Sequence, residues 1–358
     1  MKYSLSLGKF FGIKVQIHWT FLILLIWIVI SNMLSAVGVV QTLWVLLFVL
    51  SVFLCVVLHE FGHALVAKRF GIKTIDITLL PIGGVARLET IPEKPKEELL
   101  VALAGPLVNV LIALLLFALM HAPLDINTIK QLSSITSINF VANLFYVNLT
   151  LTLFNLIPAF PMDGGRILRA LLSFKMDRTF ATRVAATIGQ VLAIGFAILG
   201  FFGNPFLIFI GFFVFLGAQA EVEYTQAKSM LKGFTVNDVL MKKYQVIDVE
   251  DSIKSAVELL LDGQANNFLV MKNSHPFGTL NRDEIIKALT ERGESALVLY
   301  AMNTEMMTLH PDMPLEEAWG LIQRKKSLMP VLKNDVLLGV VDTENILEFI
   351  LVQSALKA

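Results

Sequence analysis

Charged residues are scarce in this sequence. Only 16% of its 358 residues are Asp, Glu, Lys or Arg, while 56% are apolar. An ordinary soluble domain is about a quarter charged. The mean hydropathy of +0.71 therefore points to a chain that lies partly in a lipid bilayer. The formal net charge is zero, so nothing in the composition suggests nucleic acid as a partner.

Cysteine is almost absent, because Cys55 is the only one. A disulfide within the chain is excluded, and the water-facing part needs no oxidising compartment. Cys55 lies in an apolar run, which favours a core thiol over a reactive one. No small-residue cleavage site follows the first apolar run, so we interpret that run as a retained transmembrane helix.

Long apolar runs dominate the first two thirds of the chain, and a spanning helix needs about 20 such residues. Six candidates cover residues 18–36, 43–67, 98–120, 137–160, 181–202 and 204–221. The sequence from residue 233 onwards has an ordinary soluble composition. We expect a polytopic α-helical membrane domain of about six spans over residues 1–225, and a soluble α/β domain over residues 233–358.

The positive charges are distributed unevenly between the connecting segments. Fourteen Lys and Arg residues lie in the N-terminal tail and in segments 68–96 and 166–183, whereas the loops 37–42, 121–136 and 203–205 contain only Lys130. Cytoplasmic loops carry the excess of Lys and Arg. We therefore expect both termini and the soluble domain to be cytoplasmic in a multi-pass protein of the cell membrane.

A short segment between the second and third runs has the alternation of a strand. Residues 71–79 alternate apolar and polar side chains, Pro81 and Gly83-Gly84 interrupt them, and residues 85–88 are suited to a returning strand. The pattern predicts a β-hairpin, either a cytoplasmic hairpin of no special role or one that dips towards the bilayer.

The soluble part contains an internal repeat with a constant offset of 61 residues. The matching pairs are Met241/Met302, Asp251/Asp312, Leu260/Leu321, Val270/Val331, Lys272/Lys333, Asn273/Asn334, Gly278/Gly339 and Ile285/Ile346. Each unit is predicted to contain a helix, two strands joined by a turn, and a second helix. Two such units can bury against each other apolar surface that neither buries alone.

The clearest chemical motif is His59-Glu60-Phe61-Gly62-His63. Histidines at positions i and i+4 share one helical face and can bind a single ion, while Glu60 is offset so that it can act as a base. Two core histidines are the structural alternative. That alternative is weak, because polar residues in a spanning helix cost about 2.5–3.5 kcal/mol each and usually serve a function.

A catalytic zinc ion usually has three protein ligands. Asp163 is a candidate for the third, because Pro158 and Pro161 break the fourth run before it and Gly164-Gly165 permit a sharp turn after it. A plain Asp-Gly turn explains the same residues equally well. Arg166 is close to Asp163, and Lys68 follows the histidines, so both elements are expected near the cytoplasmic face.

These motifs resemble those of the site-2 protease family of intramembrane zinc metalloproteases. His59-Glu60-x-x-His63 lies in an apolar helix, and Asn155-x-x-Pro158 leads to Asp163-Gly164, with Met162 where many members have Leu. The resemblance covers about residues 1–225. It implies one zinc ion per chain bound by His59, His63 and Asp163, with Glu60 as the catalytic base and Asn155 near the reacting carbonyl.

The resemblance also implies a function. Such an enzyme is a metalloendopeptidase that cleaves membrane-protein substrates within or next to a transmembrane segment, in regulated intramembrane proteolysis. The competing interpretations are a gated ion channel or transporter that uses the His and Asp residues as a pathway, and an inactive membrane scaffold. Glu60 favours the hydrolase, because an ion pathway does not need the spacing of His59, Glu60 and His63.

Residues 233–358 resemble a tandem pair of CBS domains, here 238–290 and 299–352. Such modules often bind adenine nucleotides through a glycine followed by Ser or Thr and then Asp or Asn. Asn281 and Asp342 replace the hydroxyl residues, and only Asn345 fits the last position. The pair is therefore either a nucleotide-binding module that regulates the protease or a docking module, for example one that forms a homodimer.

Overall fold

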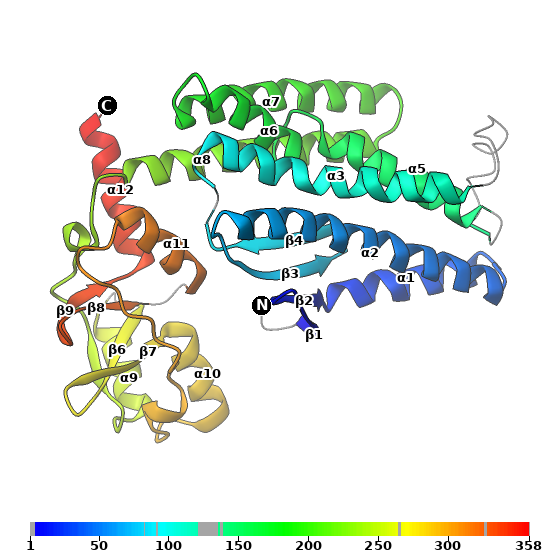
Figure 1. Cartoon of the computed structure of the whole chain (residues 1–358). Coiled ribbons are helices and arrows are strands. Elements are labelled where there is room, and N and C mark those ends of the chain that lie inside the picture. Colours follow the sequence, from blue (N-terminus) through cyan, green and yellow to red (C-terminus); the bar gives the residue numbers. More distant parts are fainter. Residues whose placement is uncertain are drawn as a thin grey trace. The chain divides into compact units, whose positions relative to one another are not determined.

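A computed structural model describes residues 4–81, 83–90, 92–120, 135–136, 139–263, 266–325 and 328–357 (Figure 1). Lys130 and most of its loop lie outside these residues. The chain divides into two compact units, Met1–Thr225 and Gln226–Ala358.

Seven helices are described in the first unit. They are α1 (Thr20–Leu34), α2 (Val39–Arg69), α3 (Pro95–Leu119), α5 (Phe140–Asn155), α6 (Asp163–Ser173), α7 (Arg178–Phe202) and α8 (Phe206–Met230). By length and composition α2, α3, α7 and α8 can cross a membrane, whereas α1 and α5 are shorter apolar helices of 15 and 16 residues. Each expected run overlaps one of these six helices.

Local sequence explains where several of these helices begin. Pro95 occupies the first turn of α3, where its missing N–H is not needed. Glu97 and Glu98 follow it, and negative charge is favourable near a helix N-terminus. Asp177 caps α7 by accepting a hydrogen bond from Thr179 N at 2.8 Å, and this bond lowers the pKa of Asp177.

Helix packing in this unit brings α3 against α2, α5 and α6, and α6 also packs on α7 (Figure 1). Small residues allow the closest approach. A Cβ on Gly62 of α2 would lie 2.7 Å from Ala104 O of α3. Large apolar side chains such as Leu111, Leu115 and Phe209 point outwards instead, as expected of helices in contact with lipid.

A four-stranded sheet completes the first unit, in the order β1-β2-β3-β4. Its strands are β1 (Ser4–Phe10), β2 (Ile13–His18), β3 (Thr74–Leu80) and β4 (Gly83–Leu88). The hairpin of β3 and β4 was predicted, but the hairpin of β1 and β2 was not. The alternation of apolar and polar residues over 13–18 was the available signal.

Residues 74–79 offer no exposed strand edge, because β3 is an inner strand of this sheet. β3 pairs in parallel with β2 and antiparallel with β4, so both of its edges are used. β4 is the outer strand on this side of the described sheet. Asp76 of β3 binds Arg87 of β4, and this bond raises the pKa of Arg87.

The second unit contains two similar α/β halves. The first has β5 (Val246–Asp248), α9 (Ile253–Asp262), β6 (Asn267–Lys272), β7 (His275–Asn281) and α10 (Arg282–Arg292). The second has α11 (Leu315–Lys325), β8 (Met329–Lys333), β9 (Val336–Val341) and α12 (Thr343–Lys357). Asn273, Ser274, Asn334 and Asp335 all have positive φ, as in type I′ hairpin turns.

The sheet of each half also pairs with a short segment that comes, in the sequence, just before the other half. Met241 pairs with Val340 of β9, and Asn303 pairs with Thr279 of β7. The matched glycines lie at these crossings: a Cβ on Gly278 would lie 2.8 Å from Asn303 O, and one on Gly339 would overlap Met241 O.

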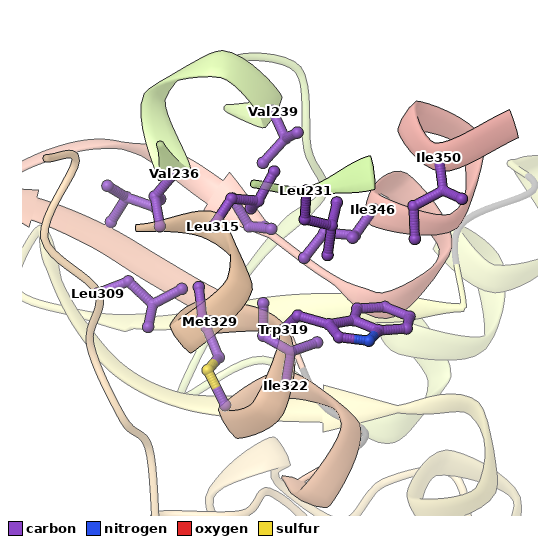
Figure 2. Close-up of a cluster of buried hydrophobic side chains, with 13 residues drawn as sticks. Leu231, Val236, Val239, Leu309, Leu315, Trp319, Ile322, Met329, Ile346 and Ile350 are labelled. Carbon is purple, nitrogen blue, oxygen red and sulfur yellow. The ribbon is translucent and has the colours of Figure 1, made fainter. Parts of the chain in front are cut away.

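The hydrophobic core of the second half also includes residues that precede the first half. Leu231, Val236 and Val239 precede the first half, yet they pack with Trp319 and Ile322 of the second half (Figure 2). The repeat therefore folds as one body, because each half buries its apolar face with help from the other.

Candidate metal centre

The two histidines of α2 project from one face of the helix and meet each other. Their ring centroids are 4.8 Å apart, and the two Nε2 atoms are separated by 3.1 Å. Both side chains are buried. Positions i and i+4 of an α-helix are neighbours on its surface, so the spacing alone accounts for this approach.

Asp163 meets both histidines from the first residue of α6. Its Oδ2 atom lies 3.2 Å from the Nε2 atom of His59 and 3.2 Å from that of His63. Pro158 and Pro161 interrupt the chain between α5 and α6, because proline cannot continue a helix. Asp163 then begins α6 beside the two histidines of α2, which precede it by more than ninety residues in the sequence.

The three side chains fit a metal ion in three respects. One ligand atom from each lies within 4.8 Å of the other two. The separations of 3.1 and 3.2 Å match the spacing of about 3.3 Å between ligands of one tetrahedral zinc ion at bond lengths of about 2.0–2.1 Å. Asp163 Oδ2 is buried and has no hydrogen-bond partner, which a metal ion would supply.

Gly105 of α3 provides the space for these ligands. A Cβ at this position would overlap His63 Nε2 and lie 2.6 Å from His59 Nε2. The sequence reasoning did not identify Gly105, although a glycine inside an apolar run was a signal of close helix approach. Only the packing of α3 on α2 assigns it to the site.

A backbone group also orients one of the histidines. His63 Nδ1 lies 2.7 Å from Val101 O of α3. Donation to this carbonyl leaves Nε2 as the atom free to bind a metal ion, which is the usual arrangement of a metal-binding histidine. His59 Nδ1 is buried without such a partner.

Glu60 lies beside the three candidate ligands and contacts the sheet. Its Oε2 atom accepts a hydrogen bond from Ala86 N of β4 at 3.0 Å. Glu60 lines a cavity of 330 Å³ together with the three candidate ligands and Asn155, the last residue of α5. The other lining residues are Gly83, Gly84, Val85, Ala86, Pro161, Arg166 and Phe213.

Every residue predicted for the catalytic site therefore lines this cavity. Further lining groups were not predicted from the sequence. The main addition is β4, whose residues 83–86 form one wall. Arg166 of α6 and Phe213 of α8 are the others. No local motif indicated β4 or Phe213, because they lie far from the histidines and from Asp163 in the sequence.

Asn345, the candidate nucleotide contact, lies in the second unit near the start of α12. It lines a separate cavity of 590 Å³ with Lys242, Lys243 and Asp342 among its neighbours. Its Oδ1 atom is buried without a hydrogen-bond partner, whereas its backbone N–H donates to Asp342 Oδ1 at 2.9 Å. Asn281 is instead the N-cap of α10.

Comparison with known proteins gives matches in both units. The model of peptidase family M50 matches residues 47–124 and 119–202, and the CBS domain model matches residues 297–352. A zinc metalloprotease of Methanocaldococcus jannaschii is 36% identical over 288 residues, which are 80% of this chain and 80% of that protein. Stage IV sporulation protein FB of Bacillus subtilis is 26% identical over 248 residues, covering 67% of this chain and 82% of that protein.

Two solved structures are also similar. The site-2 protease from Methanocaldococcus jannaschii is 39% identical and covers 62% of this chain and 95% of its own, with a TM-score of 0.45. A CBS domain pair in complex with 5′-methylthioadenosine and S-adenosyl-L-methionine is 20% identical and covers 33% of this chain and 97% of its own, with a TM-score of 0.31. The family-model matches and the Methanocaldococcus jannaschii relative confirm the resemblance, and the elements of the two units agree with the fold class stated above.

Proposed function

This chain belongs to peptidase family M50, the site-2 proteases, and we propose that it cleaves membrane proteins within or next to a transmembrane segment, near the cytoplasmic face. The zinc metalloprotease activity and the multi-pass membrane character follow from the family. The observation that carries the proposed site is the convergence of three buried ligand atoms within 4.8 Å of one another.

The proposed ligands of one zinc ion per chain are His59, His63 and Asp163. These residues would hold the ion, which would polarise a carbonyl oxygen and lower the pKa of water at the site to near neutrality. The small volume left by Gly105 supports this set, because both imidazole Nε2 atoms fit beside α3 only without a Cβ at that position.

Glu60 is the proposed general base. Its carboxylate takes a proton from the attacking water and later gives it to the leaving amine. The hydrogen bond from Ala86 N holds this carboxylate at the cavity wall. Asn155 lines the same cavity, which supports a role for its amide N–H in binding the substrate carbonyl or the developing oxyanion.

The substrate must present an extended backbone to this cavity, because the carbonyls of an intact helix are already hydrogen-bonded. We propose that an unwound substrate segment adds to the outer edge of β4, in the manner of β-strand addition. Two observations support this edge over β3: β3 is paired on both sides, and residues 83–86 line the cavity.

The topology remains the one that the Lys and Arg distribution indicates, with both termini and the CBS pair in the cytoplasm. His59 and His63 precede Lys68 by nine and five residues. At 1.5 Å per residue, these separations put the site about 13 and 8 Å below the cytoplasmic interface. Cysteine labelling in a Cys55→Ser background tests this topology, and external labelling of residues 240–350 would contradict it.

The CBS pair is proposed to regulate the protease or to mediate formation of a homodimer. Binding of an adenine nucleotide is the candidate signal, and the unpaired Oδ1 atom of Asn345 in the 590 Å³ cavity supports it. Asn281 and Asp342 replace the expected hydroxyl residues and cap helices instead, which argues for the docking role.

The channel or transporter interpretation loses support, because the relatives are zinc metalloproteases. Co-expression with candidate single-span membrane proteins tests the proposed function, with Glu60→Gln as the control. Cleavage by the natural chain and none by the variant is the expected result. Equal cleavage by both would remove Glu60 from the mechanism.

A further inference from the structure

A second buried cluster of charged residues lies in the first unit, outside the metal centre. Arg169 of α6 is fully buried, with 0% of its surface exposed, and Glu98 of α3 is 2% exposed. Arg169 Nε donates to Glu98 Oε1 at 2.9 Å, and Arg169 also pairs with Glu221 of α8. Arg178 of α7 donates to Glu98 Oε2 at 2.7 Å.

The cluster is electrically balanced, with two arginines and two glutamates that come from four different helices. A buried charge is costly unless it is paired and hydrogen-bonded. Loss of one partner leaves another charge uncompensated in the interior. These four helices are therefore held together at one point, and Arg169 is the member that touches both glutamates.

Arg169 belongs to the same short helix as Asp163. α6 has only 11 residues, and helices of this length have little stability of their own, so tertiary contacts determine where α6 lies. At 1.5 Å per residue, Arg169 is about 9 Å along the axis from Asp163. The guanidinium carbon of Arg169 also lies 5.0 Å from the ring centroid of Phe160, three residues before Asp163.

Both sides of Asp163 are consequently tied to one guanidinium. The helix after it is clamped to α3 and α8 through the two glutamates, and the segment before it packs on the same side chain through Phe160, which is 1% exposed. Asp163 Oδ2 must approach two histidines of another helix at 3.2 Å. A shift of α6 would separate these atoms.

We propose that Arg169 is a positioning residue of the metal centre, which holds Asp163 against His59 and His63 by clamping α6 to Glu98 and Glu221. This inference rests on the proposed function of Asp163 as a zinc ligand. Glu221 makes the clamp depend on α8, the helix through which the chain continues past Thr225 into the second unit. A displacement of α8 would therefore reach the metal centre through Arg169.

A double-mutant cycle on zinc affinity tests the proposal, measured by competition with a chelating dye on purified full-length protein. The four proteins are the natural chain, Arg169→Lys, Asp163→Ala and the double variant. Lysine keeps the charge but not the fork that reaches several carboxylate oxygens. We expect Arg169→Lys to weaken zinc binding about tenfold, at the lower end of the range for outer-shell partners, and to weaken it no further in the Asp163→Ala background.

A control variant tests whether loss of any arginine–carboxylate pairing lowers zinc affinity. Arg87→Lys removes another pairing in which the arginine binds a buried carboxylate through Nε and a second guanidinium nitrogen. The Arg87 side chain is 41% exposed, and Arg87 is not on a ligand-bearing helix. The zinc affinity of the Arg87→Lys variant should stay within about twofold of that of the natural chain. Glu221→Gln keeps the side-chain shape and should weaken zinc binding severalfold, and an unchanged value would remove α8 from the clamp.

Two results would overturn the role of Arg169. One is unchanged zinc affinity in Arg169→Lys, and the other is an equal loss with and without Asp163, because independent effects add. Unchanged zinc affinity in Asp163→Ala has a different meaning: it would overturn the ligand set of the proposed function, and the present inference with it.

Discussion

The two units differ most in what they bury. Among the described residues, the first unit buries His59, His63, Asp163, Glu98, Arg169 and several asparagines, whereas Thr279 is the one buried polar side chain of the second unit. The helices of the first unit also expose many large apolar side chains. The more hydrophobic unit thus has the more polar interior.

This contrast follows from the surroundings of each unit. In water, apolar burial stabilises the fold, so the second unit places its apolar residues inside. In lipid, apolar side chains gain little by moving inwards, and helices associate through close packing and polar contacts. Buried polar groups in the first unit therefore mark the candidate metal centre and the charged cluster, while the buried residues of the second unit mark its core.

The largest expected effect concerns the polar interior of the first unit. Glu60→Gln removes the proposed base without removing a ligand, so cleavage should fall by about 10²–10⁴-fold while zinc stays bound. Elemental analysis and a cleavage assay on the same preparation measure both quantities. Loss of zinc together with activity would show that Glu60 holds the metal site together instead of acting as a base.

Substitutions in the apolar core of the second unit should change its free energy of unfolding. Ile322 is fully buried in the core shown in Figure 2, so Ile322→Ala should lower the free energy of unfolding by about 2–5 kcal/mol. Urea unfolding followed by the fluorescence of nearby Trp319 measures this, in a background with Trp19, Trp27 and Trp44 changed to Phe. Leu351 is 69% exposed, and Leu351→Ala should change the value by no more than about 0.5 kcal/mol.

Two glycines allow the same substitution to be compared across the units. Gly339→Ala forces a contact with Met241 O and should lower the stability of the second unit by about 1–3 kcal/mol. Gly105→Ala forces a contact with both histidines, so it should lower zinc affinity at least tenfold. Urea titration and dye competition measure the two effects. Full zinc affinity in Gly105→Ala would mean that α3 can move away from α2 at no cost to the site.

The smallest expected effect is that of Asn345→Ala. Its buried Oδ1 atom has no partner, so the substitution should change the stability of the second unit by less than about 1 kcal/mol. Titration calorimetry with ATP, ADP and AMP then tests the nucleotide role. Binding by the natural chain that is weakened in Asn345→Ala would support it. No heat with any of the three would leave the CBS pair as a docking module.

Several structural elements could be predicted because their signal is local. The apolar runs correspond to α1, α2, α3, α5, α7 and α8, and the 61-residue repeat corresponds to the two halves of the second unit. The hairpin of β3 and β4 followed from alternation and from Pro81. The missed hairpin of β1 and β2 has a similar alternation, but in a lysine-bearing segment that was interpreted as a tail.

Other features could not be predicted, because they depend on packing between distant segments. The parallel pairing of β2 with β3 removes β3 as an edge and leaves β4 beside Glu60. The exchange of segments in the second unit puts Leu231 into the core of the second half. Neither feature has a periodicity or a motif that a local pattern could reveal.

The sequence by itself determined the membrane and soluble parts, the pair of histidines on one helical face and the duplicated C-terminal module, since each depends on residues within one or two turns or on a constant offset. Only the tertiary structure decided that Asp163 meets these histidines, that Gly105 makes room for them, and that Arg169 clamps the helix of Asp163. The physical reason is that helices in lipid are placed by close contacts between distant residues, and such contacts follow from the packing of the whole unit.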